Sequence, residues 1–363
     1  MKTLVARVLT APRAEVPWQG GPGRLIALAQ EAGLTGRGGA GFPAWRKLTE
    51  VATAHRPVVV ANAAEGEPAS SKDAELLARN PHLVLDGLQL AAEAVGAAKC
   101  HLYASRISAG HARHALDQRK DRWPVTIVEA PDLFVAGEES AVLSAVDGKR
   151  ALPRDKPKLP VHQGFLVQNV ETLAHLALIA RHGPSWFRRE GTRDEPGTFL
   201  ATLSGAVANP GVHEAPFGIP LNELLQPAEP IQAVLVGGYH GRWVPWTSEP
   251  VSRPGAGVFV ALAESVCGLD FSAQVLTYLA GQSARQCGPC LNGLPRIATL
   301  LTAVARRRAT AGTVTDLNTL AGFVIGRGAC RHPDGSARFL HSTLTTFDHE
   351  IAAHLRGTCR SRR

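Results

Sequence analysis

The residues that could do chemistry begin with a glycine-rich loop, residues 36–43, which holds four glycines and ends in a proline. Neither a helix nor a strand tolerates this composition, because glycine costs backbone entropy and proline lacks an N–H group. Such a loop can bring bare backbone N–H groups up to an anion, usually a phosphate. Arg37 adds a fixed positive charge, and Lys47 follows within reach. The alternative is a flexible surface loop, and the spacing alone favours neither.

The same loop also matches the pattern G-x-G-x-x-G at Gly36, Gly38 and Gly41. The dinucleotide-binding version of that pattern needs a strand before it and a helix that opens on the third glycine. Residues 25–32 have the pattern of a helix instead, and Pro43 comes two residues after the third glycine. We therefore reject an ordinary Rossmann turn and keep the hypothesis of a phosphate-binding loop of another type.

Acidic residues follow two apolar segments that we predict to be strands. The first segment, residues 57–61, is followed by Asn62, Glu65 and Glu67, and the second, residues 134–136, is followed by Gly137, Glu138 and Glu139. Open α/β sheets bind ligands at the carboxyl ends of their strands. Carboxylates there could hydrogen-bond a ligand's N–H groups or ribose hydroxyls. They could also be a solvated turn and a simple complement to a helix dipole.

Cysteine usage indicates a metal or redox site near the C-terminus. Cys287 and Cys290 form a C-x-x-C pair. Cys100 precedes an apolar run and is expected in the core, and Cys359 lies in a basic tail. Disulfides are not expected, because the chain reads as cytoplasmic.

Three kinds of segment must position these residues. Strands predicted at 57–61, 100–104 and 125–128 alternate with helices at about 83–96 and 107–120, which is typical of a mostly parallel sheet. A further helix is expected to begin within residues 168–173. Strands at 198–205 and 231–238 belong to a small β-rich module over residues 198–246, and a further strand is expected at 257–262. From residue 270 onward the apolar spacing predicts helices near 272–280, 295–304, 317–324 (with Asp316 as the cap) and 340–355, a four-helix bundle.

Composition excludes several classes of protein. The chain has 363 residues, 45% hydrophobic and 19% charged, which suits a soluble globular protein of two or three domains. We expect a cytoplasmic protein, since neither a secretory signal nor a run of 18 apolar residues is present. The basic excess (39 − 31 = 8) is concentrated partly at residues 306–308 and 356–363. These stretches lack the aromatic residues of a nucleic-acid groove, so we expect a solvated end, with an acidic protein partner as a further option.

Taken together, these motifs resemble the FMN- and NADH-binding flavoprotein subunit of respiratory complex I and of related NAD-linked hydrogenases and formate dehydrogenases. The resemblance runs from about residue 30 to 350 and rests on segments in the family's order: 36–42 with Lys47, 62–68, 137–139, 156–157, 169–173, 203–205 with 209–211, 287–290 and Cys330. It implies an α/β parallel-sheet FMN-binding domain (1–197), a ubiquitin-like β-grasp module (198–265), a helical bundle that binds a 4Fe–4S cluster (266–356) and a basic tail (357–363).

The resemblance also implies roles for individual residues. The residues expected to hold FMN are Gly36, Arg37, Gly38, Gly39, Lys47, Asn62, Glu65, Gly137, Glu138, Gln168, Asn169 and Thr172. Those expected to face NADH are Phe42, Glu67, Glu139 and Lys156. Hydride transfer from the nicotinamide to the flavin needs no protein acid or base, so no catalytic side chain is expected.

Four positions depart from the family pattern: Ala64 replaces an aspartate, Leu159 an aromatic residue, Gln168 an asparagine (which keeps an amide) and Ala284 the first cluster cysteine. Three thiolates remain, from Cys287, Cys290 and Cys330, where a 4Fe–4S cluster normally takes four. They could hold a 4Fe–4S cluster with an open iron or with His332 or Cys267 as a substitute ligand. They could equally hold a 3Fe–4S cluster, zinc with His332, or nothing, as free thiols of a vestigial site.

We therefore expect a flavoprotein oxidoreductase that passes electrons from NADH through FMN and an Fe–S centre to a ferredoxin-like (2Fe–2S) or membrane partner. The rival hypothesis is a non-catalytic cofactor-binding or assembly subunit. Ala64, Leu159 and Ala284 favour the rival, and the retained acidic residues with Lys156 favour the enzyme.

Overall fold

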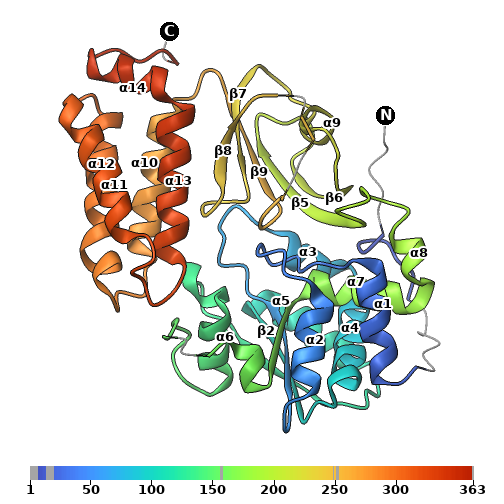
Figure 1. Cartoon of the computed structure of the whole chain (residues 1–363). Coiled ribbons are helices and arrows are strands. Elements are labelled where there is room, and N and C mark those ends of the chain that lie inside the picture. The colour runs from blue at the N-terminus through green and yellow to red at the C-terminus, as the bar shows by residue number, and fades with distance from the viewer. Residues whose placement is uncertain (1–6, 14–19, 156–157, 248, 251–252, 362–363) are drawn as a thin grey trace.

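The structure is a computed structural model that describes residues 7–13, 20–155, 158–247, 249–250 and 253–361. Three bodies are visible in Figure 1: an α/β body, a second sheet and a set of long helices that ends the chain. Among the residues that the structure describes, no helix combines the length and the apolar character needed to cross a bilayer.

The α/β body is built on a four-stranded sheet in the order β3-β2-β1-β4, with every pair parallel. Its strands are β1 (Val58–Ala63), β2 (Lys99–Ala104), β3 (Val125–Glu129) and β4 (Phe165–Asn169). The sequence predicted the first three of these strands. The chain moves outward from β1 to β3 and then returns to the other side of β1, so the strand order reverses between β1 and β4.

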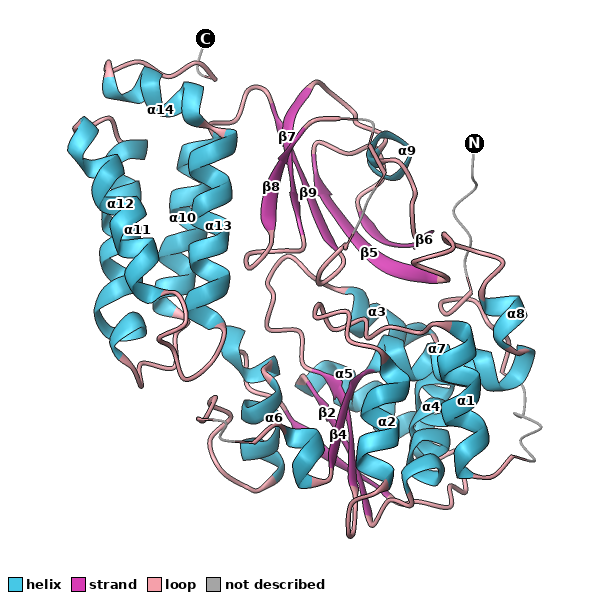
Figure 2. Ribbon diagram, viewed as in Figure 1, coloured by secondary structure: helices cyan, strands magenta, loops and turns pink. Residues whose placement is uncertain are grey.

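Both faces of this sheet are buried, as the continuous run of valines in β1 requires. Val59 and Ala61 belong to the core cluster that also contains α4 (Pro81–Val95) and α7 (Val170–His182). Val60 points to the opposite face, where a smaller cluster contains α6 (Glu139–Val146). Figure 2 shows α6 on one side of the sheet and α1, α2 and α4 on the other. The remaining helices of this body are α1 (Pro22–Ala32), α2 (Ala44–Ala52), α3 (Lys72–Arg79), α5 (Arg106–Leu116) and α8 (Pro184–Phe187).

The second sheet has five strands in the order β6-β5-β9-β7-β8 and mixed pairing, with β5 parallel to β9. The elements are β5 (Thr198–Gly205), β6 (Gly211–Pro216), α9 (Leu221–Leu225), β7 (Ile231–Val236), β8 (Arg242–Pro245) and β9 (Val258–Ala263). All six residues of β9 are buried, because α9 covers one face and the C-terminal helices pack on the other.

The C-terminal helices are α10 (Gly268–Gly281), α11 (Leu294–Ala305), α12 (Ala311–Val324), α13 (His332–Thr346) and α14 (Asp348–Leu355). A short π-helical turn, η3 (Pro289–Gly293), precedes α11. Helices α10 to α13 run side by side in Figure 1 and share one apolar core.

Several local predictions were wrong, each for an identifiable reason. Residues 134–137 form a 3-10 turn (η1, Phe134–Gly137) that crosses over Gly66, so close that a Cβ there would lie 2.3 Å from a carbonyl oxygen of the turn. The expected helix start at residue 168 lies inside β4, and α7 begins only after Asn169, whose side chain caps it. The expected helix 340–355 is broken at Phe347. Thr310, not Asp316, caps α12, through a reciprocal capping box with Thr313.

The basic tail also differs from expectation, because the described residues 357–361 are attached to α14. The hydroxyl of Thr358 donates to the Ala353 carbonyl at 3.1 Å. The Arg360 N–H donates to the Glu350 carboxylate at 2.9 Å. These contacts place Cys359 against the helical body instead of in solvent.

Candidate functional site

The predicted flavin-binding residues meet at the carboxyl edge of the parallel sheet. Asn62 is the next-to-last residue of β1 and Asn169 is the last of β4, and the two residues pair across the strands at the point where the strand order reverses. Such a switch point leaves a crevice in which open α/β sheets bind their ligands. The Asn62 amide donates to the Gly137 carbonyl at 3.1 Å, which brings the turn before α6 to the same place.

The glycine-rich loop lies over this edge. Gly36 N–H donates to the Phe42 carbonyl at 2.8 Å and closes the loop. Gly39 (φ 100°) and Gly41 (φ 63°) adopt left-handed conformations that other residues rarely take. A Cβ on Gly38 would lie 3.4 Å from the side chain of Asn169. The loop thus presents exposed backbone beside a polar strand end, and this fits the phosphate-binding hypothesis better than a loop directed into solvent.

Lys47 and the two adjacent glutamates of α6 form a charged group on the same edge. The Lys47 ammonium donates to Glu139 at 2.5 Å and to the Val167 carbonyl at 3.3 Å. Glu138 caps α6 by accepting the Ser140 N–H at 2.9 Å. Lys47 is therefore held above β4, where a ligand phosphate could exchange with or join its carboxylate partner.

Glu65 and Glu67 leave the same strand end in different directions. Glu65 accepts the N–H groups of Asp73 and Ala74, at 2.9 and 3.0 Å, and so caps α3. Glu67 turns toward the second sheet and accepts the Tyr239 N–H at 2.7 Å. Burial raises the pKa of Glu67 to about 7, although the N–H groups of Tyr239 and Ala69 oppose the shift. This carboxylate stands between the two sheets.

The Arg37 side chain does not serve the role expected of it. Only 5% of the residue is exposed, and its guanidinium donates to the Thr198 carbonyl at 3.1 Å and to Thr35, in the interior. Burial lowers the pKa of Arg37 to about 10, although Glu171 opposes the shift. Its backbone N–H donates to Thr172 at 2.9 Å. Arg37 and Thr172 thus fasten the glycine-rich loop to α7, and the arginine charge lies away from the loop's exposed face.

Sequence reasoning missed a buried charge network beneath this site. The Lys72 ammonium lies 2.7 Å from Asp73, 2.9 Å from Glu171 and 3.2 Å from Asn169. Burial opposes the charge of Lys72, but the two carboxylates outweigh it and raise the Lys72 pKa. Burial would raise the pKa of Glu171, but Lys72 and the neighbouring cationic groups hold it at about 2. Glu171 also accepts the Leu200 N–H of β5 at 2.8 Å, so the network joins the two sheets.

One orphaned donor marks the site as able to take a further ligand. The Gln168 amide nitrogen is buried, and among the described residues it has no hydrogen-bond partner. Buried amides are rarely left unsatisfied, because that costs about 1–3 kcal/mol. A polar ligand at this strand end would supply the missing acceptor, as the flavin hypothesis requires.

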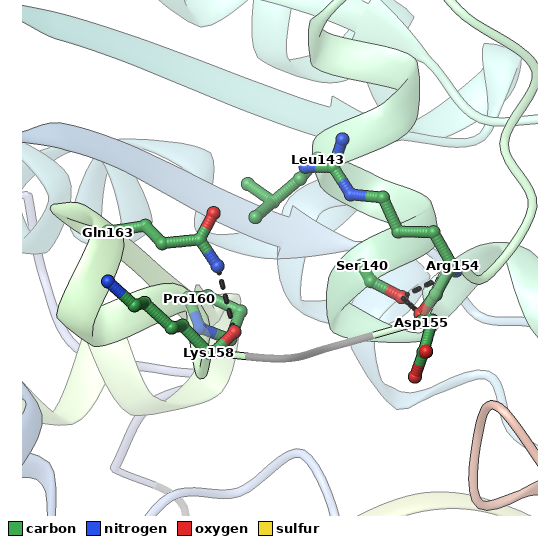
Figure 3. A pocket seen from close by; sticks show the side chains of 7 residues that line it. All are labelled: Ser140, Leu143, Arg154, Asp155, Lys158, Pro160 and Gln163. Carbon is green, nitrogen blue, oxygen red and sulfur yellow. Dashed lines mark hydrogen bonds between the residues drawn. The ribbon is translucent and has the colours of Figure 1, made fainter.

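The residues expected to face NADH are only partly placed. Phe42 is 45% exposed at the rim of the glycine-rich loop, and Leu159 is 56% exposed. Lys156 lies outside the described residues. Asp155 and Lys158, which are close to it in the sequence, line a pocket of about 340 Å³ between α6 and the turn η2 (Pro160–Gln163). Figure 3 shows this pocket. Its lining residues are Ser140, Leu143, Arg154, Asp155, Lys158, Pro160 and Gln163.

The three predicted cluster cysteines lie together between η3 and α13. Burial, together with the neighbouring Cys287 and Cys330, raises the pKa of the Cys290 thiol to about 12. Cys290 and Cys330 are buried, and Cys287 is partly exposed. Cysteine binds a metal as the thiolate, so a cation bound here would displace the Cys290 proton. The donor set therefore fits three corners of an iron–sulfur cluster.

Neither of the substitute fourth ligands named from the sequence is supported. One His332 nitrogen lies 2.9 Å from the Leu279 carbonyl and the other 3.1 Å from His240, so both are engaged. Cys267 caps the opposite end of α10. A helix of 14 residues spans roughly 20 Å, which is too far for a shared cluster. At the position of the missing cysteine, Ala284 offers no ligand atom.

Two known domain families match parts of the chain. Residues 29–178 match the Nuo51 FMN-binding domain, and residues 270–354 match the NADH-ubiquinone oxidoreductase-F iron-sulfur binding region. The first match covers the glycine-rich loop and the sheet edge, and the second covers all three clustered cysteines. The expected FMN and iron–sulfur chemistry is thus supported by two separate parts of the chain.

Curated relatives agree along nearly the whole length. The chain is 30% identical to one of the NADH-quinone oxidoreductase F subunits of Rhizobium meliloti (strain 1021), over 92% of this chain and 89% of that protein. It is 29% identical to the corresponding F subunit of Streptomyces coelicolor, over 93% and 84%. It is 27% identical to the NADP-reducing hydrogenase subunit HndC of Solidesulfovibrio fructosivorans, over 97% and 78%.

Solved structures of similar fold include NAD+-reducing [NiFe]-hydrogenase. The air-oxidized state superposes with a TM-score of 0.89 at 29% identity, covering 97% of this chain and 67% of that chain. The H2-reduced state gives 0.86 at 30% identity, covering 92% of this chain and 63% of that chain, so this chain spans less than two thirds of it. The α/β fold with a parallel sheet is confirmed by these likenesses. On these matches, the chain belongs to the family of NADH-quinone oxidoreductase F subunits.

Proposed function

We propose that this protein is the NADH- and FMN-binding subunit of a multi-subunit electron-transfer complex. In this role it passes electrons from NADH through FMN and an iron–sulfur centre to a one-electron acceptor. The observation that carries the proposal is the convergence of the glycine-rich loop, Lys47, Asn62 and Asn169 at the switch point of a parallel sheet. The cysteine cluster in the C-terminal helices supports it independently.

FMN supplies the redox chemistry when bound, because it takes a hydride and gives up electrons one at a time. The chain's own residues bind and orient it. The exposed backbone of the glycine-rich loop and the Lys47 ammonium suit the phosphate, since both favour negative charge. Gln168 offers its buried, unpartnered amide nitrogen to the polar edge of the ring, and Asn62 and Asn169 shape the strand end beside it through their hydrogen bonds to Gly137 and Asp73. No side chain has to move a proton.

The residues that we assign to NADH binding lie around the proposed FMN site. Phe42 provides an exposed aromatic face at the rim, and Glu67 and Glu139 provide carboxylates on either side of the strand end. Lys158 and Arg154 in the 340 Å³ pocket are cations that could receive a dinucleotide phosphate. With leucine at position 159, a stacking contact with the adenine is lost, which costs about 1 kcal/mol.

We assign three modules to the chain: an FMN-binding domain (1–197), a β-grasp module (198–265) and a helical cluster-binding bundle (266–356). The mixed sheet with α9 over one face supports the β-grasp assignment. The shared core of α10 to α13 supports the bundle. The cluster would take three protein thiolates, from Cys287, Cys290 and Cys330, with a non-thiolate fourth position.

The surface beside the cluster suits an acidic electron-transfer partner such as a ferredoxin-like protein. Leu291, Phe323 and Ile325 are large apolar residues that are 47%, 54% and 54% exposed. Leu291 follows Cys290 directly, and Val324, at the end of α12, contacts the turn η3 at Gly293. Exposed apolar patches of this kind mark binding sites. Arg285 and Arg296 flank η3, and Arg327 follows α12, so the complementary charge is negative.

The rival function is a non-catalytic assembly subunit, which Ala64, Leu159 and Ala284 favour. A visible spectrum of the purified protein separates the two. The enzyme shows flavin absorption at about 450 nm that bleaches when NADH is added without oxygen. Flavin bands that persist under excess NADH would eliminate the dehydrogenase activity and leave the rival.

A further inference from the structure

The tertiary structure brings together four potential metal ligands that are unrelated to the cluster cysteines. They are Cys267, Glu350, His354 and Cys359, and one ligand atom from each lies within 4.8 Å of all the others. The first three residues are at most 4% exposed, and Cys359 is partly exposed. Polar groups are costly to bury unless they bond one another or share an ion, and a cation here would be a common partner for all four.

Two of the distances between the ligand atoms are close to the edges of a zinc tetrahedron, and the others are at most 4.8 Å. Zinc bonds of about 2.3 Å to sulfur and about 2.0–2.1 Å to nitrogen or oxygen give ligand–ligand edges of about 3.5 Å for S–N and about 3.3 Å for N–O. The Cys267 sulfur lies 3.5 Å from the His354 Nε2. The same Nε2 lies 3.1 Å from the Glu350 carboxylate. Little movement is needed for an ion to enter.

Surrounding groups hold the ligands in the required state. The His354 Nδ1 lies 3.0 Å from the Val304 carbonyl, which fixes that nitrogen as the N–H donor and leaves Nε2 as the electron-pair donor. Cys267 occupies the N-cap position of α10, so its sulfur is held at the first turn of that helix. Glu350 and His354 are four residues apart on α14 and share one helix face.

We propose that Cys267, Glu350, His354 and Cys359 bind a structural Zn²⁺ ion. Two thiolates, an imidazole and a carboxylate form a closed four-coordinate set of the kind that zinc prefers, without an open position for catalysis. A hollow of about 310 Å³ that includes Cys267 opens to the surface there and gives the ion an entry path.

The ion would fasten the C-terminal segment to the junction between β9 and α10. Helix α10 runs from this junction to the cysteine cluster. An ion that holds the N-terminal end of α10 would therefore also hold the cluster in position against the second sheet. The two metal sites are separated by the length of α10, roughly 20 Å. Zinc here therefore takes no part in electron transfer, and the inference does not depend on the proposed function.

The test measures zinc and iron in the full-length chain, purified without oxygen and dialysed against a weak chelator. We expect about one zinc per chain in the wild type. Cys359→Ala should lose the zinc and keep the iron, while Cys287→Ala should keep the zinc and lose the iron. His349→Gln is the matched control, because His349 lies on the same helix but outside the site, and it should keep both metals.

A Co²⁺ titration of zinc-stripped protein supplies a spectroscopic readout. The wild type should develop thiolate-to-cobalt charge-transfer absorption, and Cys359→Ala should bind Co²⁺ at least about 100-fold more weakly, since even the loss of a group that only supports a ligand costs about 10–100-fold. Circular dichroism checks that this variant, changed only in the terminal segment, stays folded. The proposal would be overturned if the wild type bound neither zinc nor Co²⁺. It would also be overturned if zinc were lost in Cys287→Ala and kept in Cys359→Ala.

Discussion

Replacing Lys72 with methionine removes the cation at the centre of the buried charge network. Lys72 is 3% exposed, and its ammonium lies 2.7 Å from Asp73 and 2.9 Å from Glu171. Methionine fills similar space and leaves two carboxylates buried without their cation. Breaking a buried ion pair in this way costs about 3–5 kcal/mol. The unfolded fraction should therefore rise more than about 100-fold.

The pH dependence identifies the cause. In the wild type the folded pKa of Glu171 is about 2, below its ordinary 4.5, so its contribution to stability is present above pH 4.5 and is lost as the pH falls toward 2. In Lys72→Met the main group that lowers this pKa is gone, so burial raises the pKa above 4.5. The variant should then recover stability relative to the wild type as the pH falls from 8 to 5, because its carboxylates take up protons.

The assay is urea unfolding at pH 8 and pH 5 with excess FMN, which holds flavin occupancy constant. Lys149→Met is the matched control, since Lys149 is exposed and its replacement should change stability by no more than about 0.5 kcal/mol. The double variant Lys72→Met/Glu171→Gln should be more stable than Lys72→Met alone. A loss below about 1 kcal/mol at pH 8, or a loss that is the same at both pH values, would refute the reasoning.

Three other substitutions test the same geometry. Lys47→Met should weaken FMN binding about 10- to 100-fold in a flavin fluorescence titration, since a charge-assisted hydrogen bond contributes about 1.5–3 kcal/mol; unchanged affinity would remove Lys47 from the site. Ala284→Cys should add a fourth thiolate, and analytical iron with electron paramagnetic resonance should report a cluster that better survives exposure to air; an unaltered signal and lifetime would show that position 284 does not face the cluster. Burial raises the pKa of Glu214 to about 7 from 4.5, so its carboxylate destabilises the fold above pH 7 and loses that effect as the pH falls toward 4.5. Glu214→Gln should gain up to about 3 kcal/mol relative to the wild type at pH 8 and little at pH 5, measured by urea unfolding; the opposite trend would contradict the assignment.

The sequence by itself determined the family, the parallel α/β sheet and the three cysteines that the structure brings together. These features depend on local signals. The valine run of β1 needs burial on both faces, the glycine-rich loop cannot be regular structure, and a C-x-x-C pair is close in any fold. Lys47, Asn62 and Asn169 were also identified from the sequence, because polar residues at parallel strand ends must share one edge of the sheet.

Only the tertiary structure decided what each charged side chain contacts. Arg37 sits in the most distinctive motif of the chain, yet its guanidinium turns inward to Thr198 and Glu171. Lys72 carried no sequence signal, because a lysine followed by an aspartate usually lies on a solvated surface. Lys72 becomes the centre of a network only when β5 packs against α7 and excludes water from the side chains between them.

The C-terminal site shows the same limit most clearly. Cys267 and Cys359 are 92 residues apart (359 − 267 = 92), and neither forms a motif with its neighbours. Their meeting depends on the break at Phe347, which starts α14, and on hydrogen bonds that return the tail to that helix. Periodicity predicted one continuous helix there, because apolar spacing reports which face is buried and does not report where a chain turns back. Long-range contacts of this kind follow from packing and cannot be derived from spacing.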